Sequence, residues 1–195
     1  ALYDDVAIEN VLVTHGAIGA NKLVHETLVE PNDRVISVQP TYQQHYSIPA
    51  SYGADVHVLT LRETDGYQPD LDQMRSLATA ETSLIAINNP NNPTGALMDA
   101  ATLTEIGHIA ASCNAHVLCD EVYRGTDQVG SGSSASIVEV YDRGISTGSM
   151  SKAFSLAGLR LGWMVAPADV IKAAELHRDY STISIGMIND FLSAI

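Results

Sequence analysis

Short apolar runs and helical stretches alternate along this chain of 195 residues, and no other feature restricts its fold as strongly. Strands and helices in alternation predict α/β layering around a largely parallel sheet. Open sheets of this type bind ligands at the carboxyl ends of their strands. The predicted strands are 11–14, 34–38, 55–60, 83–87, 116–119, 144–147 and 161–165, and the predicted helices are 17–29, 43–52, 70–78, 99–113, 169–181 and 186–195.

The size and composition of the chain fit one well-buried domain. Hydrophobic residues make up 46% of the sequence, and neither an internal repeat nor a low-complexity tract is apparent. The densest glycine and serine stretch, 130–134, is too short for a domain linker and is predicted to be a surface loop. We therefore expect residues 1–195 to form a single domain.

Composition also restricts the partners and the location of the protein. A formal net charge of -13 with only ten Lys and Arg residues argues against a nucleic-acid backbone as partner. No apolar run approaches the roughly 20 residues that span a bilayer, and the chain does not start like a signal peptide. Cys113 and Cys119 lack metal-type pairing, which suits a reducing compartment. We expect a soluble, cytoplasmic protein that binds neither nucleic acid nor membrane.

A lysine and an arginine stand close together in this acidic chain. Lys152 ends the run Ser-Met-Ser-Lys that begins at Ser149, and Arg160 lies eight positions further on. A lysine amine can form a Schiff base with an aldehyde, and an arginine fork can hold a phosphate at two points. Pyridoxal phosphate carries both groups. Because a lysine taken alone is more often a solvated surface charge, this hypothesis depends on the neighbouring motifs.

Two further motifs follow apolar, strand-like runs. Asp120 and Tyr123 belong to the run Asp-Glu-Val-Tyr that comes directly after 115–119. An aspartate can pair with a protonated pyridine nitrogen, and a tyrosine hydroxyl three residues on can reach the phenolic oxygen of the same ring. The second motif, Asn-Asn-Pro-Asn-Asn-Pro-Thr-Gly at 88–95, follows 84–87, and its Asn-Pro and Thr-Gly pairs predict a tight loop.

Taken in order, Asn-Asn-Pro-Thr-Gly, Asp-Glu-Val-Tyr, Ser-Met-Ser-Lys and Arg-Leu-Gly-Trp resemble the motifs of the class I/II aminotransferase family, the fold-type I pyridoxal-phosphate enzymes. The resemblance covers nearly the whole chain. It implies a three-layer α/β/α large domain with a mainly parallel, roughly seven-stranded sheet. It also implies a homodimer that transfers an amino group between an amino acid and a 2-oxo acid.

The resemblance implies a role for each residue around the ring of pyridoxal phosphate. Lys152 would form the Schiff base and later move the proton between the substrate's α-carbon and the cofactor. Asp120 would bind the pyridine nitrogen, and Asn92 and Tyr123 would hydrogen-bond the ring's 3-oxygen. Tyr42, in the run Gln-Pro-Thr-Tyr, would stack on the ring face, although a tyrosine after a proline is more often a loop anchor.

The phosphate end has its own candidates. Small residues after the strand 11–14 lead into a predicted helix, and the backbone N–H groups and dipole at a helix start favour a phosphate. The resemblance implies that Gly16, Ala17 and Ile18 cradle the phosphate, while Ser149 and Arg160 grip it. This turn does not complete the dinucleotide fingerprint G-x-G-x-x-G. Glycine-rich turns between a strand and a helix also occur for steric reasons alone.

The spacing of the histidines does not predict a metal site. None pairs with another at metal-ligand spacing, and most are predicted to lie on the surface or in loops. His15 stands apart because it lies in the predicted phosphate loop. The seven are His15, His25, His45, His57, His108, His116 and His177.

Members of the family are considerably longer than this chain. They carry an amino-terminal arm and a carboxyl-terminal small domain, which supplies an arginine for the substrate's α-carboxylate. We expect both to be absent here, so that cofactor binding survives better than turnover. The segment 180–184 resembles the region that reaches across the family's dimer interface.

The sequence is also compatible with three other kinds of function. The run 144–148 matches G-x-S-x-G, and Asp169 and His177 follow Ser146 in the order of an α/β-hydrolase triad. A nucleophile elbow needs a helix directly after the serine, however, whereas Ser146 lies inside a predicted strand. A β-lyase or a decarboxylase could use the same lysine and aspartate. A non-catalytic domain that binds pyridoxal phosphate as a sensor is the third alternative.

Overall fold

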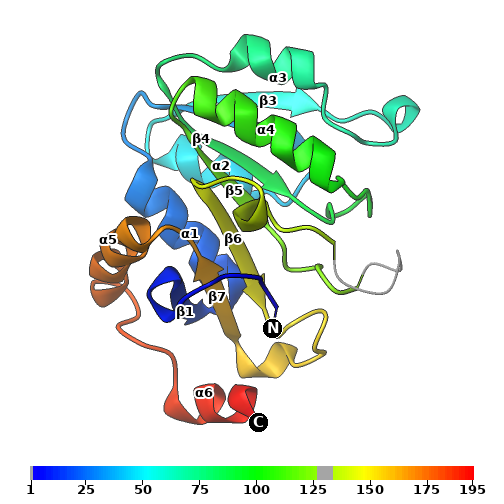
Figure 1. Ribbon diagram of the computed structural model, residues 1–195. Coiled ribbons are helices and arrows are strands. Elements are labelled where there is room, and N and C mark those ends of the chain that lie inside the picture. The colour runs from blue at the N-terminus through cyan, green and yellow to red at the C-terminus, as the bar shows by residue number, and fades with distance from the viewer. Residues whose placement is uncertain (1, 127–133) are drawn as a thin grey trace.

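The computed structural model describes residues 2–126 and 134–195, in which seven strands form one sheet (Figure 1). The strands are β1 (Val11–His15), β2 (Arg34–Gln39), β3 (Asp55–Thr60), β4 (Thr82–Asn88), β5 (His116–Asp120), β6 (Gly144–Ser149) and β7 (Leu161–Val165). The helices are α1 (Gly16–Leu28), α2 (Gln44–Ser51), α3 (Leu71–Leu77), α4 (Ala100–Ser112), α5 (Ala168–Asp179) and α6 (Met187–Ala194). Each predicted element is present, and its bounds agree within two residues. The predicted surface loop 130–134 lies outside the described residues, apart from Ser134.

The strand order is β1-β7-β6-β5-β4-β2-β3. The pairs β2–β3, β2–β4, β4–β5 and β5–β6 are parallel, whereas β7 runs antiparallel to both of its neighbours, β1 and β6. The prediction of a mainly parallel, seven-stranded sheet is therefore confirmed. The antiparallel β7 is an addition that the sequence pattern did not reveal.

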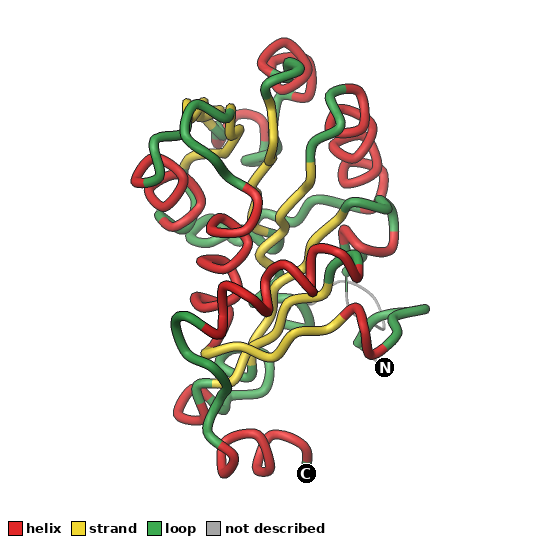
Figure 2. The backbone as a smooth tube through the Cα atoms, turned by 90° about the vertical axis from the view of Figure 1, so that its left-hand side faces the viewer, coloured by secondary structure: helices red, strands yellow, loops and turns green. Residues whose placement is uncertain are grey.

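Helices cover both faces of the sheet and form a three-layer fold (Figure 2). Successive side chains of a strand point to opposite faces, so the apolar residues of β4 can pack against helices on both sides of the sheet. Ile85 and Ile87 belong to the apolar cluster that includes Leu103 and Ile106 of α4. Leu84 and Ala86 belong to the cluster formed with α1 and α5 on the other face. A strand that is buried on both faces favours a run of consecutive apolar residues, and β4 has such a run at 84–87.

Side-chain caps start two of the helices on the α4 face. Asp70 accepts a hydrogen bond from the backbone nitrogen of Gln73, and Asp99 accepts one from Thr102, so that each carboxylate satisfies an unpaired N–H of the first turn. At the end of the chain, all α6 side chains are at least partly exposed, and Asn189 donates to the carbonyl of Leu159 at 2.7 Å. None of the helices described here is long and apolar enough to cross a membrane.

Candidate active site

The predicted site residues meet at one edge of the sheet. Asp120 is the last residue of β5 and Ser149 is the last residue of β6, and Lys152 follows in the turn after β6. Since β7 runs in the opposite direction, its amino end lies at the same edge, and Gly162 pairs there with Ser149. Arg160, the residue just before β7, is placed beside the other side chains for this reason.

A cavity of about 290 Å³ opens at this edge. Gly16 is the one predicted site residue outside its lining, but a β-carbon on Gly16 would lie only 2.8 Å from Nη2 of Arg160. His15 is exposed at the end of β1. The predicted residues in the lining are Ala17, Ile18, Tyr42, Asn92, Asp120, Tyr123, Ser149, Lys152 and Arg160.

The amine of Lys152 lies over an aromatic ring. Its Nζ is 5.4 Å from the centroid of the Tyr123 ring, at a distance where the ring face attracts a cation weakly. Lys152 is an exposed residue that lines the cavity. The amine can therefore be reached by a small molecule that enters from solvent.

The Asp120 carboxylate is buried and hydrogen-bonded at both oxygens. Its Oδ1 accepts from the backbone nitrogen of Val122 at 3.0 Å, and its Oδ2 accepts from Nδ2 of Asn21 at 2.7 Å. Nε2 of His45 lies 3.7 Å from the same Oδ2. Asp120 is only 3% exposed and is held by these hydrogen bonds, and its carboxylate belongs to the lining of the cavity.

Sequence reasoning missed three residues around Asp120. Asn21 on α1 and His45 on α2 are fully buried, and Thr147 on β6 donates to Oδ1 of Asn21 at 2.6 Å. Most histidines are at least partly exposed, as predicted, but His45 and His25 are buried where α1 and α2 pack on the sheet. One signal was available, since Asn21 is a polar residue on the apolar face of the predicted helix 17–29.

A chain of asparagines shapes the loop after β4. Asn88 donates to the backbone carbonyl of Asp120 at 2.6 Å and accepts from the backbone nitrogen of Asn92, also at 2.6 Å. Asn91 donates to the carbonyl of Pro40 at 3.1 Å, which ties the loop to the segment that carries Tyr42. These bonds hold Asn92 and Tyr42 on the wall of the cavity.

The guanidinium of Arg160 lies beside the start of α1. Gly16 has φ +65°, a left-handed conformation that suits glycine, and the first N–H groups of a helix have no partner within the helix. Arg160 is also left-handed, with φ 50°, and its Nη1 donates to Oγ of Ser151 at 3.2 Å and to the carbonyl of Ala157 at 3.0 Å. A helix start and a guanidinium together form an environment for an anion.

The hydrolase alternative does not fit the position of Ser146. This residue is fully buried inside β6, which continues to Ser149, and its hydroxyl is 3.0 Å from the hydroxyl of Tyr3. A nucleophile elbow would place the serine between a strand and a helix. Ser146 is therefore a residue of the strand interior.

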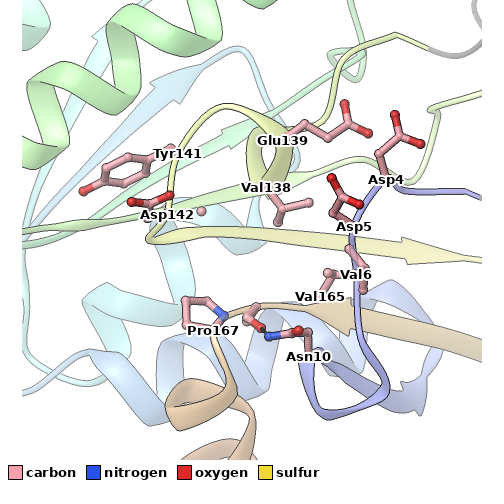
Figure 3. A pocket seen from close by; sticks show the side chains of 12 residues that line it. Asp4, Asp5, Val6, Asn10, Val138, Glu139, Tyr141, Asp142, Val165 and Pro167 are labelled. Carbon is pink, nitrogen blue, oxygen red and sulfur yellow. Dashed lines mark hydrogen bonds between the residues drawn. The ribbon is translucent and has the colours of Figure 1, made fainter.

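A larger cavity, of about 470 Å³, lies away from these residues (Figure 3). It is bounded by the start of β6 and the end of β7, and thus opens at the opposite edge of the sheet. Its lining includes the carboxylates of Asp4, Asp5, Glu139 and Asp142, which would repel an anion. The smaller cavity around Lys152 is the better site for a phosphorylated ligand.

Comparisons with known proteins point to one family. A family model described as aminotransferase class I and II matches residues 3–187. Capreomycidine synthase from Streptomyces vinaceus is 34% identical over 186 residues, which cover 95% of this chain and 47% of that protein. An aspartate aminotransferase from Pyrococcus horikoshii is 34% identical over 175 residues, which cover 86% of this chain and 43% of that protein.

Solved structures agree with these sequence relatives. The crystal structure of a PLP-dependent aminotransferase from Streptococcus suis superposes with a TM-score of 0.93 at 46% identity, over 98% of this chain and 50% of that chain. An aspartate aminotransferase mutant from Thermus thermophilus superposes with a TM-score of 0.90 at 26% identity, over 96% of this chain and 52% of that chain. The chain thus spans about half the length of the relatives it matches.

Proposed function

Because the chain belongs to the class I and II aminotransferase family, we propose that it binds pyridoxal 5'-phosphate in the cavity around Lys152 and that the protein transfers an amino group between an amino acid and a 2-oxo acid. One observation carries this proposal. An amine, a buried carboxylate and a guanidinium, from Lys152, Asp120 and Arg160, line the same cavity of about 290 Å³.

The residues present suit each polar group of this cofactor. When bound, pyridoxal phosphate supplies an aldehyde that combines with amines and a ring that withdraws electrons from a substrate's α-carbon. Asp120 would hold the ring nitrogen, and Asn92 and Tyr123 would donate to the ring's 3-oxygen. Tyr42, which is 39% exposed, would cover a ring face. Lys152 would hold the cofactor at Nζ and then move a proton at the substrate's α-carbon.

The phosphate would lie where Arg160 approaches the start of α1. The missing side chain of Gly16 leaves room beside the guanidinium, and Ala17 and Ile18 follow in the first turn of the helix. Ser149 would add a hydroxyl from the end of β6. The phosphate oxygens would accept hydrogen bonds from the guanidinium of Arg160, from the first N–H groups of α1 and from the hydroxyl of Ser149.

Residues 1–195 form the large, cofactor-binding domain in this proposal, and a second copy of the protein is its partner. Exposed apolar side chains near the end of the chain support an interface, because large exposed apolar patches mark contact surfaces. Tyr180 is 93% exposed, Met187 84% and Ile188 71%. Analytical ultracentrifugation of the chain with pyridoxal phosphate tests the dimer, and a monomer at every concentration would count against it.

We also propose a cytoplasmic location. Cys113 and Cys119 are both free thiols, and free thiols persist in reducing compartments. Cell fractionation tests this, and recovery of the protein from an oxidising compartment would overturn it.

The test of the cofactor assignment is an absorption spectrum with added pyridoxal phosphate, followed by borohydride reduction and peptide mapping. We expect a pyridoxyl adduct on Lys152 and its loss in Lys152→Ala. Lys22→Ala and Lys172→Ala, which change exposed lysines, are matched controls that should keep the adduct. An adduct spread over Lys22 and Lys172 with none on Lys152 would refute the assignment.

A further inference from the structure

Asn21 connects the start of α1 to the carboxylate at the end of β5. The side chain is fully buried, and its Nδ2 donates to Oδ2 of Asp120 at 2.7 Å. Its Oδ1 accepts from Oγ1 of Thr147 at 2.6 Å, and its Nδ2 also donates to Oε1 of Gln44 at 3.3 Å. All the polar atoms of this amide therefore have partners, which come from three different elements, α2, β5 and β6.

The partners of Asn21 leave the amide a single orientation. An ionised carboxylate only accepts hydrogen bonds, so the NH₂ group must face Asp120. The amide oxygen then faces Thr147, whose hydroxyl can donate to it. Asp120 and Thr147 are paired directly across β5 and β6, and both side chains therefore point to the face on which α1 packs. A reversed amide would set its oxygen against the carboxylate.

The nature of the donor matters for the charge of Asp120. An asparagine amide stabilises a carboxylate without neutralising it, whereas a lysine or arginine at this position would cancel its charge. With Oδ1 bound to the backbone nitrogen of Val122 and Oδ2 bound to Asn21, the plane of the carboxylate is fixed. Each oxygen keeps a lone pair that can accept a further hydrogen bond, and a ligand in the cavity can provide the donor because Asp120 belongs to its lining.

We propose that Asn21 is a positioning residue that aims the Asp120 carboxylate at the ring nitrogen of the cofactor. This inference rests on the proposed function. Asn21 lies five residues after Gly16, a rise of about 7.5 Å along a rigid helix. The helix α1 thus sets both the start of the phosphate site and the direction of the carboxylate that meets the ring.

The test compares two probes on the full chain and on Asn21→Leu, a substitution of similar size without a donor. The probes are pyridoxal phosphate and its analogue with carbon in place of the ring nitrogen. We expect the dissociation constant for pyridoxal phosphate to rise about tenfold in the variant, as for a lost hydrogen bond to a charged group. The constant for the analogue should stay the same, because it lacks the atom that Asp120 binds.

Tyr141→Phe is the matched control. It removes one side-chain hydrogen bond, to the carbonyl of Ala115 at 2.7 Å, at the opposite end of β5. This control should leave the constants for both probes unchanged. If Asn21→Leu does not fold, Asn21→Ser keeps a polar group at the site and is measured in the same way.

Two results would overturn the inference. Equal weakening of both probes in the Asn21 variant means that the residue is only structural, and unchanged binding of pyridoxal phosphate means that Asp120 needs no positioning. A wild-type chain that binds neither probe refutes the proposed function instead, so that the two failures can be told apart.

Discussion

A β-carbon on Gly162 would lie 2.5 Å from the backbone nitrogen of Ala17, and 2.2 Å from the carbonyl carbon of Gly16. The amino end of β7 therefore touches the first turn of α1, with no room for even a methyl group between them. This contact fixes the helix start beside Arg160, which lies two residues before Gly162. The proposed phosphate site depends on how closely these two backbones approach.

Gly162→Ala should push β7 and α1 apart. We expect a loss of about 1–3 kcal/mol in the free energy of unfolding, typical of overpacking, together with weaker binding of pyridoxal phosphate. Urea denaturation and a binding titration measure the two effects. A β-carbon on Gly158 would meet no described atom within 4 Å, so Gly158→Ala is the control. Equal behaviour of the two variants would contradict this account.

Removal of the Arg160 guanidinium should weaken phosphate binding alone. Arg160→Asn suits the left-handed backbone at this position and should raise the dissociation constant for pyridoxal phosphate about tenfold or more. Pyridoxal, which has no phosphate, should bind equally well before and after the change. Arg62→Asn, on an exposed segment, should alter neither constant. The same loss for both compounds would mean that Arg160 supports the fold rather than the phosphate.

The buried carboxyl of Glu121 should make stability depend on pH. Burial raises its pKa to about 7 from an ordinary 4.5, although hydrogen bonds from the backbone of Ile137 and the hydroxyl of Ser136 lower it. Between these two values the folded protein binds a proton that the unfolded chain lacks, so stability falls as the pH rises. Over this range we expect a loss of about 3 kcal/mol relative to Glu121→Gln.

The measurement for Glu121 is urea denaturation between pH 4 and pH 8, about the window in which its protonation differs between the two states. Glu63→Gln, which changes an exposed carboxylate, should keep the wild-type profile. A Glu121→Gln profile that runs parallel to the wild-type one would show that this carboxyl ionises as easily in the folded protein as in the unfolded chain.

The buried His25 should make stability depend on pH in the direction opposite to that of Glu121. Burial, together with the nearby His45, lowers the pKa of His25 to about 3, and neither of its ring nitrogens has a hydrogen-bond partner among the described residues. The unfolded chain binds a proton below pH 6.5, whereas the folded protein does not, so stability falls as the pH drops from about 6.5 to about 3. His25→Leu should remove this loss, while His108→Gln, on an exposed side chain, should keep it. Thermal denaturation at several pH values checks this, and an unchanged acid profile in His25→Leu would contradict it.

The elements of this fold could be predicted from local sequence. The apolar run of β4 indicates a strand buried on two faces, and Asp70 and Asp99 sit at the starts of α3 and α4, where their carboxylates cap the first turn. The motifs that contain Asp120, Ser149 and Lys152 are also visible in the local sequence, whereas the roles of these residues are predictions from the family that the motifs resemble. These signals depend on neighbours in the chain, and the sequence therefore carries them in full.

Only the tertiary structure decided which strands are neighbours and which side chains meet. The antiparallel β7 inserts between β1 and β6, which brings Arg160 to the edge where Lys152 lies. Asn21 reaches Asp120 across 99 positions of the chain, and His45 is buried against the same carboxylate. Hydrophobic periodicity assigns a residue to a face of its own element, but it does not name the residue on the facing element. Contacts of this kind result from packing between distant segments, which no local pattern encodes.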